Sequence, residues 1–374
     1  MERNNQLLKK LDFWVGIPLL YCLSLLKRRG VSKPKEIKVI GIFAFAAIGD
    51  SILSSCLLPT LKNQYPQAKI TVFSSAANAA IYSILSGYDE LVILPVTKPL
   101  KALRLLRKYS FDVLIDTSQW PKLSALYSLF IKAKFKIGFK TPGQYRHFGY
   151  DEVVRHSNAV HELQNFEDLL KPLGISQREI VALDLPKIVG QSIHDVDIDV
   201  RNPYIIFHPW ASGTRSELRE WPITCWVELG KKVLEENHHI IITGSAQNQS
   251  QSIKLAQLIG GGETVKVMAG ALSFAGVARL ILGANAVVSV NTGIAHLADQ
   301  LKVPTVVLNG PTNSARWGLI NASSINLNVP KINGGGFLNL GFEYPNNPQY
   351  LMDKISVQAV CSALKQITAS ARAI

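Results

Sequence analysis

The residues from Ser289 to Thr312 combine types and spacing that could bind an anion. The segment runs from a strand-like end into two good helix N-cap residues, a glycine and a histidine, namely Asn291, Thr292, Gly293 and His296. The unpaired N–H groups of a first helical turn point outward, and the helix dipole favours a negative partner there by roughly 0.3 to 1 kcal/mol. A phosphate group fits such a corner, and an ordinary helix cap in a β–α–β crossover is the alternative interpretation.

The composition indicates a globular chain of two domains with an excess of positive charge. Its 374 residues exceed the usual size of one domain, and 47% hydrophobic with 18% charged residues is not the composition of a disordered chain. The net charge of +13 favours phosphate-rich partners such as nucleotides or an anionic membrane. The four cysteines show no CxxC spacing, so we expect neither a metal site nor a disulfide framework.

Residues 1–34 form an apolar and basic amino-terminal segment. Phe13 to Leu26 is almost entirely apolar and is flanked on both sides by lysine and arginine, but it is too short to span a bilayer comfortably. Basic residues follow it where a signal peptide would have a cleavage site. We expect an interfacial helix with Trp14 and Tyr21 at headgroup depth, and the alternative is a helix packed against its own domain.

Strand-like and helix-like stretches then alternate in two series, which predicts an α/β protein with doubly wound parallel sheets. Residues 186–203 lack either period and are the predicted linker between domains at 35–185 and 204–374, with a last helix that could return to the first domain. The predicted strands are Ile37 to Phe43, Ile70 to Ser74, Leu91 to Pro95, Asp112 to Asp116 and Phe135 to Phe139, then Tyr204 to His208, His239 to Thr243, Val265 to Met268, Ala286 to Val290 and Thr305 to Leu308.

Open α/β sheets bind ligands at the carboxyl ends of their strands, so the loops there are the candidate sites. They are Ala44 to Asp50, His208 to Pro222, Thr243 to Asn248 and the segment from Ser289. No GxGxxG and no Walker lysine loop is present, which argues against a nicotinamide dehydrogenase or an NTPase. The string Asp195, Asp197 and Asp199 alternates with apolar residues and is better explained by a solvated edge strand than by a metal-bound diphosphate.

Taken together, these loops resemble glycosyltransferase family 9, the heptosyltransferases that build the lipopolysaccharide inner core. The resemblance extends over residues 37 to 365 and implies a GT-B fold, two facing Rossmann-like domains with an interdomain cleft. The first domain would hold the acceptor and the second the nucleotide-sugar. The motifs that carry it are Ile48-Gly49-Asp50-Ser51, Tyr65-Pro66, His208-Pro209, Arg219-Glu220-Trp221-Pro222, Asn291-Thr292-Gly293-Ile294-Ala295-His296 and Gly310-Pro311-Thr312.

The chemistry that this resemblance implies is inverting, metal-independent transfer of a sugar, heptose by family, from an ADP-sugar to a lipid-linked saccharide such as the lipopolysaccharide core. Such an enzyme works in the cytoplasm or on the inner face of the membrane, uses no cofactor and binds no nucleic acid. Asp50 is the predicted catalytic base, a role typically worth roughly 10²- to 10⁴-fold in rate, and the alternative is a helix-capping aspartate. Arg219 and the N–H groups near Thr292 and Gly293 would receive the diphosphate.

Further site residues follow from the same motifs and from basic positions near them. The predicted donor-binding residues also include Asn291, His296, Ser212, Thr214 and Gly244, and the predicted acceptor-binding residues are Lys140, Arg146 and Arg104. Trp221 is expected in the core. The basic run from Lys98 to Lys108 is expected to be a solvated helix face, with contact to anionic lipid or acceptor phosphates as the alternative.

Several positions depart from the family pattern. Asn291 stands where Asp is usual, Arg219 replaces Lys, Trp210 takes the place of a glycine, and the loop Gly244 to Asn248 lacks the acidic residue that contacts ribose in relatives. These departures leave open a different nucleotide-sugar donor. They also leave open a non-catalytic role, binding a nucleotide-sugar or acting as a scaffold in surface-polysaccharide assembly.

Overall fold

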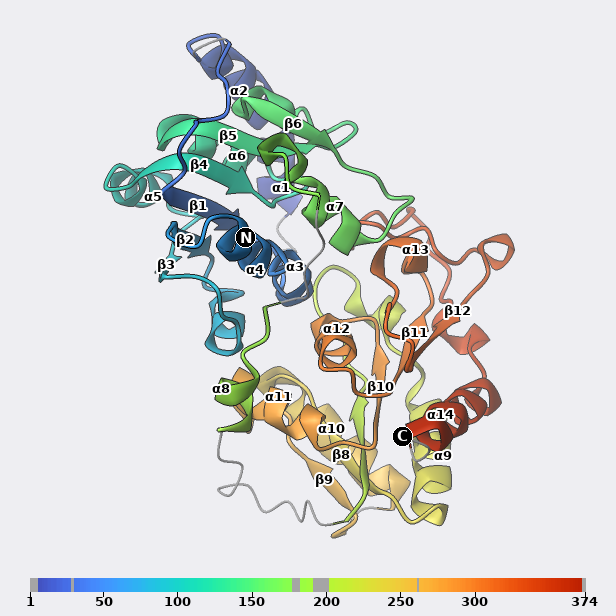
Figure 1. The fold of residues 1–374 in the computed structure, drawn as a ribbon. Coiled ribbons are helices and arrows are strands. Elements are labelled where there is room, and N and C mark those ends of the chain that lie inside the picture. The colour runs from blue at the N-terminus through green and yellow to red at the C-terminus, as the bar shows by residue number, and fades with distance from the viewer. Residues whose placement is uncertain (1–5, 28–29, 177–181, 191–201, 261, 372–374) are drawn as a thin grey trace. The chain divides into compact units, whose positions relative to one another are not determined.

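A computed structural model describes residues 6–27, 30–176, 182–190, 202–260 and 262–371. The chain divides into two compact units, Met1–Ala182 and Leu183–Ile374 (Figure 1). The aspartates at 195, 197 and 199 and most of the predicted linker lie outside the described residues. Each unit is an α/β layer with its own buried core.

The first unit is built on a sheet of six parallel strands with apolar, mostly buried centres. Along the sheet the strands are β3 (Glu90–Ile93), β2 (Lys69–Ser74), β1 (Val39–Ala44), β4 (Ser110–Asp116), β5 (Lys132–Lys140) and β6 (Glu152–Arg155). The helices that connect or follow them are α3 (Ile48–Ser54), α4 (Leu57–Gln64), η1 (Ala79–Ile84), α5 (Pro99–Leu106), α6 (Lys122–Phe130), η2 (Arg146–Gly149), α7 (Glu162–Asp168) and η3 (Lys171–Leu173).

The second unit repeats this architecture with a second parallel sheet. Its strands, in spatial order, are β12 (Ser324–Asn328), β11 (Thr305–Asn309), β10 (Ala286–Val290), β7 (Tyr204–His208), β8 (His239–Ile242) and β9 (Val265–Val267). Its helices are α8 (Leu185–Val189), η4 (Ser216–Arg219), α9 (Ile223–Glu235), η5 (Ala246–Asn248), α10 (Gln249–Ile259), α11 (Phe274–Leu282), α12 (Gly293–Gln300), α13 (Ser314–Trp317), η6 (Lys331–Asn333), η7 (Met352–Lys354) and α14 (Val357–Ala371).

Both sheets have the Rossmann order, in which the chain starts at a central strand, moves to one edge and then returns to fill the other side. The order reverses between β1 and β4 in the first unit and between β7 and β10 in the second. Loops that leave these central strands therefore diverge and leave room for a ligand at their carboxyl ends. The predicted α/β class is confirmed, and this topology places three of the four predicted site loops at the two switch points, while the loop Thr243 to Asn248 follows the neighbouring strand β8.

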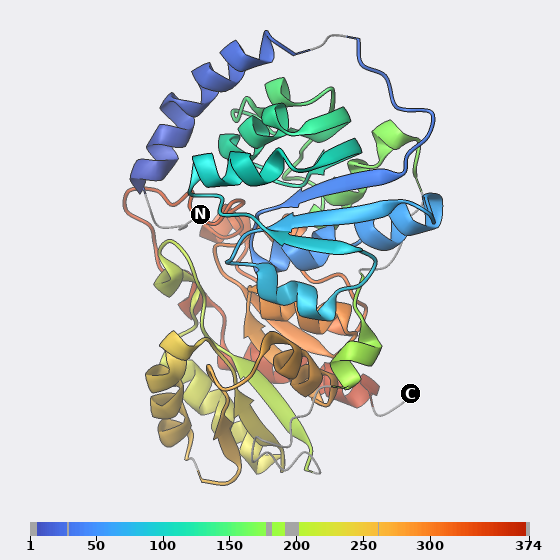
Figure 2. The ribbon, with the colours of Figure 1, turned by 90° about the vertical axis from the view of Figure 1, so that its left-hand side faces the viewer.

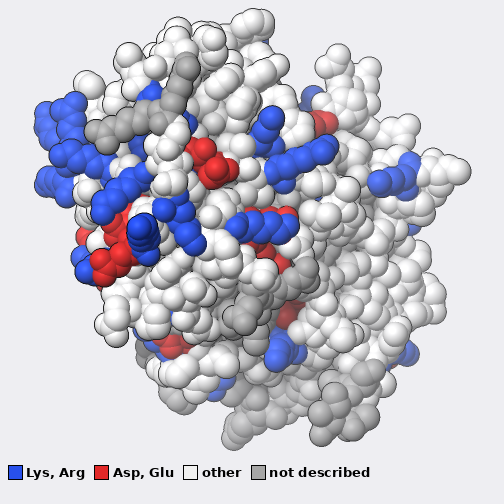
Figure 3. All heavy atoms as spheres, turned by 45° about the horizontal axis from the view of Figure 1, so that its top comes forward, with Lys and Arg blue, Asp and Glu red and all other residues white. Residues whose placement is uncertain are grey.

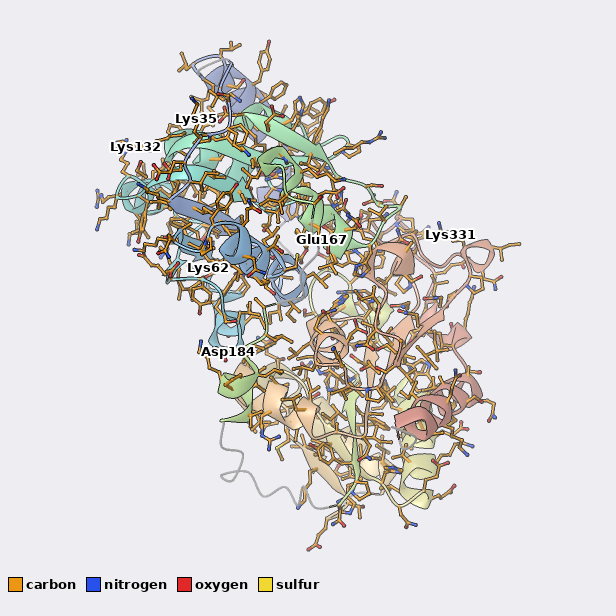
Figure 4. All side chains as sticks on the ribbon, in the orientation of Figure 1. Lys35, Lys62, Lys132, Glu167, Asp184 and Lys331 are labelled. Atoms are coloured by element: carbon orange, nitrogen blue, oxygen red, sulfur yellow. The ribbon has the colours of Figure 1, made fainter. Side chains whose placement is uncertain are left out.

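Each predicted strand overlaps an observed one, and two strands were missed. The missed strands, β6 and β12, lie at sheet edges and have half-buried or exposed side chains, so they lack the continuous apolar run of a central strand. The predicted linker contains a helix, α8, which begins where the Asp184 carboxylate (Figure 4) accepts a hydrogen bond from the Lys187 N–H at 3.2 Å. The last helix, α14, packs on α9 and on the sheet of the second unit through Val360, Leu364 and Ile367.

Two short helices, α1 (Gln6–Trp14) and α2 (Gly16–Ser24), lie along the outside of the first unit (Figure 2). Leu20 on α2 is fully buried, and both helices pack against α6. The packing of their inner face therefore matches the alternative expectation, a helical segment packed against its own domain. None of the helices in the described ranges has the length and hydropathy needed to cross a membrane.

Candidate functional site

Asp50 lies in the first turn of α3, directly after the central strand β1, and its carboxylate is held at both oxygens. Its Oδ2 accepts a hydrogen bond from the Ala47 N–H at 3.2 Å, and its Oδ1 accepts one from Gln119 Nε2 at 2.9 Å. Gln119 follows β4, which pairs with β1, so the sheet itself brings these two residues together. Asp50 is 9% exposed, and its oriented carboxylate lies just after the carboxyl end of β1, at the switch point of the sheet.

The loops around this Asp50 corner are fixed by a buried asparagine and a threonine. Asn78 Nδ2 donates to the Ala44 carbonyl and to Ser51 Oγ, both at 2.7 Å, so it ties the end of β1 to α3. Thr117 donates from its N–H and its Oγ1 to the Phe43 carbonyl, at 3.0 and 2.9 Å. These bonds set the direction in which α3 leaves the sheet and hence the position of Asp50.

Arg146 is fully buried, which does not support the predicted contact with an acceptor. Its Nη2 lies 2.8 Å from Asp116 Oδ2 and 2.9 Å from Ser124 Oγ, and its Nε donates to the Pro121 carbonyl at 2.9 Å. The Tyr150 hydroxyl donates to the same Asp116 oxygen at 2.6 Å. A charge that is buried and paired in this way stabilises the fold around the β4 loop instead of reaching a ligand.

The other two predicted acceptor residues lie at opposite ends of the strands of the first sheet. Lys140 ends β5 and is exposed, at the same carboxyl edge from which α3 starts. Arg104 is exposed in the last turn of α5, a helix that runs back along the sheet toward the amino ends of the strands. The topology therefore places Lys140, and not Arg104, at the edge that carries Asp50.

Thr292 occupies the N-cap position of α12, directly after the central strand β10 of the second unit. Its side chain makes no capping hydrogen bond. Asn291, the other predicted cap, instead donates from Nδ2 to Asn309 Oδ1 at 2.7 Å and to the Trp317 carbonyl at 2.8 Å. The first-turn N–H groups that start at Gly293 are thus not satisfied by a side-chain cap, and this Thr292 corner has the geometry of an anion site.

His296 lies in the same helix turn but is almost completely buried. Its ring lies edge-on to Trp317, with 6.2 Å between the centroids. Trp317 in turn donates from Nε1 to the Asn339 carbonyl at 2.7 Å. His296 therefore packs under the Thr292 corner, and its role in donor binding stays a prediction.

The loop after β7 folds back on itself and brings two predicted donor residues together. The Arg219 guanidinium donates to the Ser212 carbonyl, and the Glu220 carboxylate accepts from the Ala211 N–H at 3.0 Å. Thr214 is half-buried in the same loop. Trp221 is buried, donates to the Ile355 carbonyl at 2.8 Å and packs edge-on against Trp226, so its expected place in the core is confirmed.

His208 ends β7 beneath this loop and is neutral at neutral pH. Burial lowers the pKa of its imidazole to about 4, and Nδ1 lies 2.9 Å from Thr243 Oγ1. His208 therefore adds no positive charge to this loop, whose charged residues are Arg215, Glu217, Arg219 and Glu220.

Trp210, which stands where the family has glycine, packs over Gly244. Its indole Nε1 donates to Ser252 Oγ at 2.8 Å, and a Cβ added at Gly244 would lie 2.8 Å from Trp210 Cδ1. Gly244 is thus required by the close approach of the indole. The next residue, Ser245, donates from Oγ to Asn248 Oδ1 at 2.6 Å, so this loop offers amide and hydroxyl groups in place of a carboxylate.

Gln119, Asn78 and Asn309 are the residues of these corners that the sequence reasoning missed. None belongs to a motif, but Gln119 follows the strand Ser110–Asp116, and the neighbouring strand β1 leads into the helix that contains Asp50. In the described ranges, no group of three or more His, Cys, Asp or Glu side chains is arranged to hold a metal ion.

Comparison with known proteins shows which family this chain is similar to. The sequence profile of glycosyltransferase family 9 (heptosyltransferase) matches residues 100–334. Lipopolysaccharide heptosyltransferase 1 of Pseudomonas aeruginosa is 37% identical over 153 residues, which are 39% of this chain and 41% of that protein. Over this match the chain therefore spans about two fifths of the relative's length.

A second relative and a solved structure extend the likeness over most of the chain. Lipopolysaccharide heptosyltransferase 2 of Salmonella typhimurium is 23% identical over 290 residues, 71% of this chain and 81% of that protein. The structure of Escherichia coli ADP-heptose lipopolysaccharide heptosyltransferase II has a TM-score of 0.71 at 19% identity and covers 90% of this chain and 100% of its own. That likeness shows a two-domain fold of the GT-B type. The chain belongs to glycosyltransferase family 9, the heptosyltransferase family, and is a glycosyltransferase of that family.

Proposed function

We propose that this protein transfers heptose from ADP-heptose to a lipopolysaccharide-core saccharide, with inversion at the anomeric carbon. The donor is suggested by the E. coli structure, which is named for ADP-heptose, and the acceptor by relatives named lipopolysaccharide heptosyltransferases. The observation that carries the proposal is the Asp50 carboxylate, held by Gln119 and Ala47 at the switch point of the first sheet.

In this reaction Asp50 acts as the general base. It takes the proton of an acceptor hydroxyl while the hydroxyl oxygen attacks the anomeric carbon and the bond from that carbon to the diphosphate breaks. One positioned base suffices for such a single displacement, and the first unit is the proposed acceptor domain. Lys140, exposed at the carboxyl edge of the same sheet, is the proposed contact for acceptor phosphate or carboxylate groups.

The second unit is the proposed donor domain, in which the leaving diphosphate gains negative charge. The first-turn N–H groups of α12 and the guanidinium of Arg219 would stabilise that charge without a metal ion. Ser212, Thr214, Gly244 and His296 line or support the same loops. A metal-independent enzyme keeps its full rate in excess EDTA, which is the check on this part of the proposal.

Two features favour testing donors other than ADP-heptose. Trp210 covers Gly244, and the loop that follows β8 presents Ser245 and Asn248 where the family resemblance implies an acidic residue. A thermal-shift screen of nucleotide-sugars and free nucleotides separates these donors, with ADP-heptose and ADP expected to raise the melting temperature most. Binding without any transfer by the wild-type protein would instead favour the non-catalytic nucleotide-sugar-binding role.

The decisive experiment compares Asp50→Asn with the wild type. The amide cannot accept the proton, so kcat should fall roughly 10²- to 10⁴-fold while the melting temperature shift with ADP is unchanged. Glu36→Gln, at a salt-bridged but exposed glutamate of the same unit, is the matched control and should keep its rate. Near wild-type turnover by Asp50→Asn would refute the mechanism.

Because the acceptor is lipid-linked, we also propose that the enzyme works as a peripheral protein at the inner face of the cytoplasmic membrane. Net charge of +13 is consistent with an anionic surface as partner.

A further inference from the structure

The outward side of α1 and α2 carries a dense group of exposed apolar side chains. Eight large apolar residues are exposed within a stretch of sixteen, and Trp14 and Leu26 reach 74% and 84% exposure. We call this group the outer apolar face, and it consists of Leu11, Phe13, Trp14, Val15, Leu19, Tyr21, Leu25 and Leu26. Single exposed apolar residues are ordinary, but a contiguous group of this size marks an interaction surface.

The inner side of the same helices packs against the first unit and is hydrogen-bonded to it. The Asp12 carboxylate accepts hydrogen bonds from the N–H groups of Lys122 and Leu123, at 2.9 and 3.1 Å, and so caps α6 from outside. Lys122 Nζ lies 3.5 Å from Asp12 Oδ2 and 5.2 Å from the centroid of the Phe13 ring. Because α6 has no side-chain cap of its own, the amino-terminal helices complete the domain and are not a loose tail.

Leu20 continues this attachment along α2, and two members of the outer apolar face, Phe13 and Tyr21, also contact the first unit at the border of that face. Leu20 is fully buried against Ala125 and Tyr150, and Tyr21 meets Phe148 edge-on at 5.2 Å between centroids. Gly16 lets the backbone approach α6, since a Cβ there would lie 3.1 Å from Lys122 Cβ. The outer apolar face is thus fixed in orientation relative to the sheet that carries Asp50.

Basic side chains flank this face on the same side of the sheet. Helix α5 also packs on α6, and Lys101 and Arg104 on this helix are exposed beside the strongly exposed Leu100. Arg107 and Lys108, also exposed, follow directly after α5. Figure 3 shows lysine and arginine gathered at the left-hand edge, where α5 lies in Figure 1. Tryptophan, tyrosine and aliphatic residues bordered by cations match the headgroup and upper acyl region of an anionic bilayer.

We infer that the outer apolar face, with the basic face of α5 beside it, docks the first unit flat on an anionic lipid bilayer. This docking surface rests on the proposed peripheral location, and both assume a lipid-linked acceptor. Docking does not insert a spanning helix, because Asp12 on the inner side is engaged by α6 and the helix is interrupted at Val15. The fixed attachment would instead hold the acceptor domain in one orientation to the lipid surface.

The test measures co-sedimentation of the full chain with vesicles of phosphatidylglycerol and phosphatidylcholine, and with vesicles of phosphatidylcholine alone. The variant Trp14→Ser/Leu25→Ser/Leu26→Ser removes exposed apolar area but keeps Asp12 and Leu20, and should partition roughly tenfold or more weakly. The matched control Ile253→Ser/Leu258→Ser/Ile332→Ser removes exposed apolar residues of the second unit and should sediment like the wild type. If the triple variant melts early, Leu26→Ser alone gives the same comparison.

The charge component is tested with Lys101→Gln/Arg107→Gln/Lys108→Gln, which should weaken binding to the anionic vesicles at low salt and change binding little at high salt. Equal sedimentation of wild type and apolar variant overturns the inference. A wild-type protein that does not sediment with anionic vesicles also overturns the inference, as does one that forms a dimer through this face in sedimentation velocity.

Transfer to a delipidated, soluble acceptor separates this inference from the proposed activity. The apolar variant should keep its rate on that acceptor, because the face lies outside the Asp50 corner. A wild type that binds vesicles but transfers no sugar would overturn the proposed activity and leave the docking surface standing.

Discussion

The Asp50 corner of the first unit and the Thr292 corner of the second both lie at the switch points of sheets with the same strand order, Asp50 after the first strand in chain order and Thr292 after the fourth. The two corners are held by different chemistry. In the first, the Asp50 carboxylate accepts a hydrogen bond from Gln119, which follows β4, the strand that ends at Asp116 of the buried Asp116–Arg146 pair. In the second, Asn291 and Asn309 form a neutral amide network beneath uncapped helix N–H groups.

The contrast fits two different tasks. A base must keep one carboxylate oriented and able to receive a proton, which polar side chains at fixed distances provide. A diphosphate site gains from backbone N–H groups and loses from nearby negative charge, so amides suit it better than carboxylates. Substitutions at the groups that hold each corner should therefore change stability or rate in different ways.

The largest effect is expected at the buried pair of the first unit. Arg146→Leu leaves Asp116 buried without its partner, so the free energy of unfolding should fall by about 3 to 5 kcal/mol in a denaturant titration. Arg155→Leu, on an exposed arginine of β6, should change stability by less than about 0.5 kcal/mol. A stable Arg146→Leu protein with a raised acceptor KM would restore Arg146 as an acceptor residue.

A smaller and pH-dependent effect is expected at His208 of the second unit. Its pKa of about 4 in the fold lies below the usual 6.5, so the unfolded chain binds the proton first as pH falls. Stability contributed by the neutral imidazole is present above about pH 6.5 and is lost between that pH and 4, to a total of about 3 kcal/mol.

His208→Gln keeps a partner for Thr243 without a titrating group. Urea melts from pH 7 to pH 4 should show the wild type losing more stability than the variant. Parallel curves for the two proteins would show that His208 does not supply this pH dependence.

Gln119 gives the next effect, on rate instead of stability. Gln119→Leu removes a hydrogen bond to a charged group worth about 1.5 to 3 kcal/mol, so kcat should fall roughly 10- to 100-fold with the donor KM unchanged. Gln119→Glu should also move the acidic limb of the pH–rate profile to higher pH, because two neighbouring carboxylates resist joint ionisation. Gln67→Leu, at an exposed glutamine of the same unit, is the control. An unmoved pH profile in Gln119→Glu would assign Gln119 a structural role only.

The smallest effect is expected at Asn291. In Asn291→Asp a carboxylate would face the Asn309 Oδ1 and the Trp317 carbonyl, two acceptors, at a cost of about 1 to 2 kcal/mol. Asn309 cannot turn its amide without losing its own bonds to Asn326 and Asn328. Thermal melts with and without ADP should show lower stability and a smaller shift on binding, whereas Asn347→Asp should resemble the wild type. A more stable variant would mean that the family's aspartate fits this network.

The sequence was sufficient for the alternation of strands and helices because buried parallel strands are continuous apolar runs. It was not sufficient for β6 and β12, whose side chains are only partly covered, or for α8, which depends on the capping Asp184 and the buried Ile188. Motif spacing located Asp50, Thr292, Gly293 and Arg219 at the ends of central strands or in the loops that follow them. It also selected Arg146, because a basic residue after a strand gives no sign of whether it will be buried.

The sequence by itself therefore determined the fold class, the family and the loops that are predicted to carry the chemistry, since these depend on local periodicity and on motifs a few residues long. Only the tertiary structure decided which side chains position those loops. Gln119 reaches Asp50 across 69 residues because β1 and β4 pair, and Asp12 caps α6 across 110 residues because the amino-terminal helices pack there. Contacts between distant positions are set by strand order and packing, which no short stretch of sequence encodes.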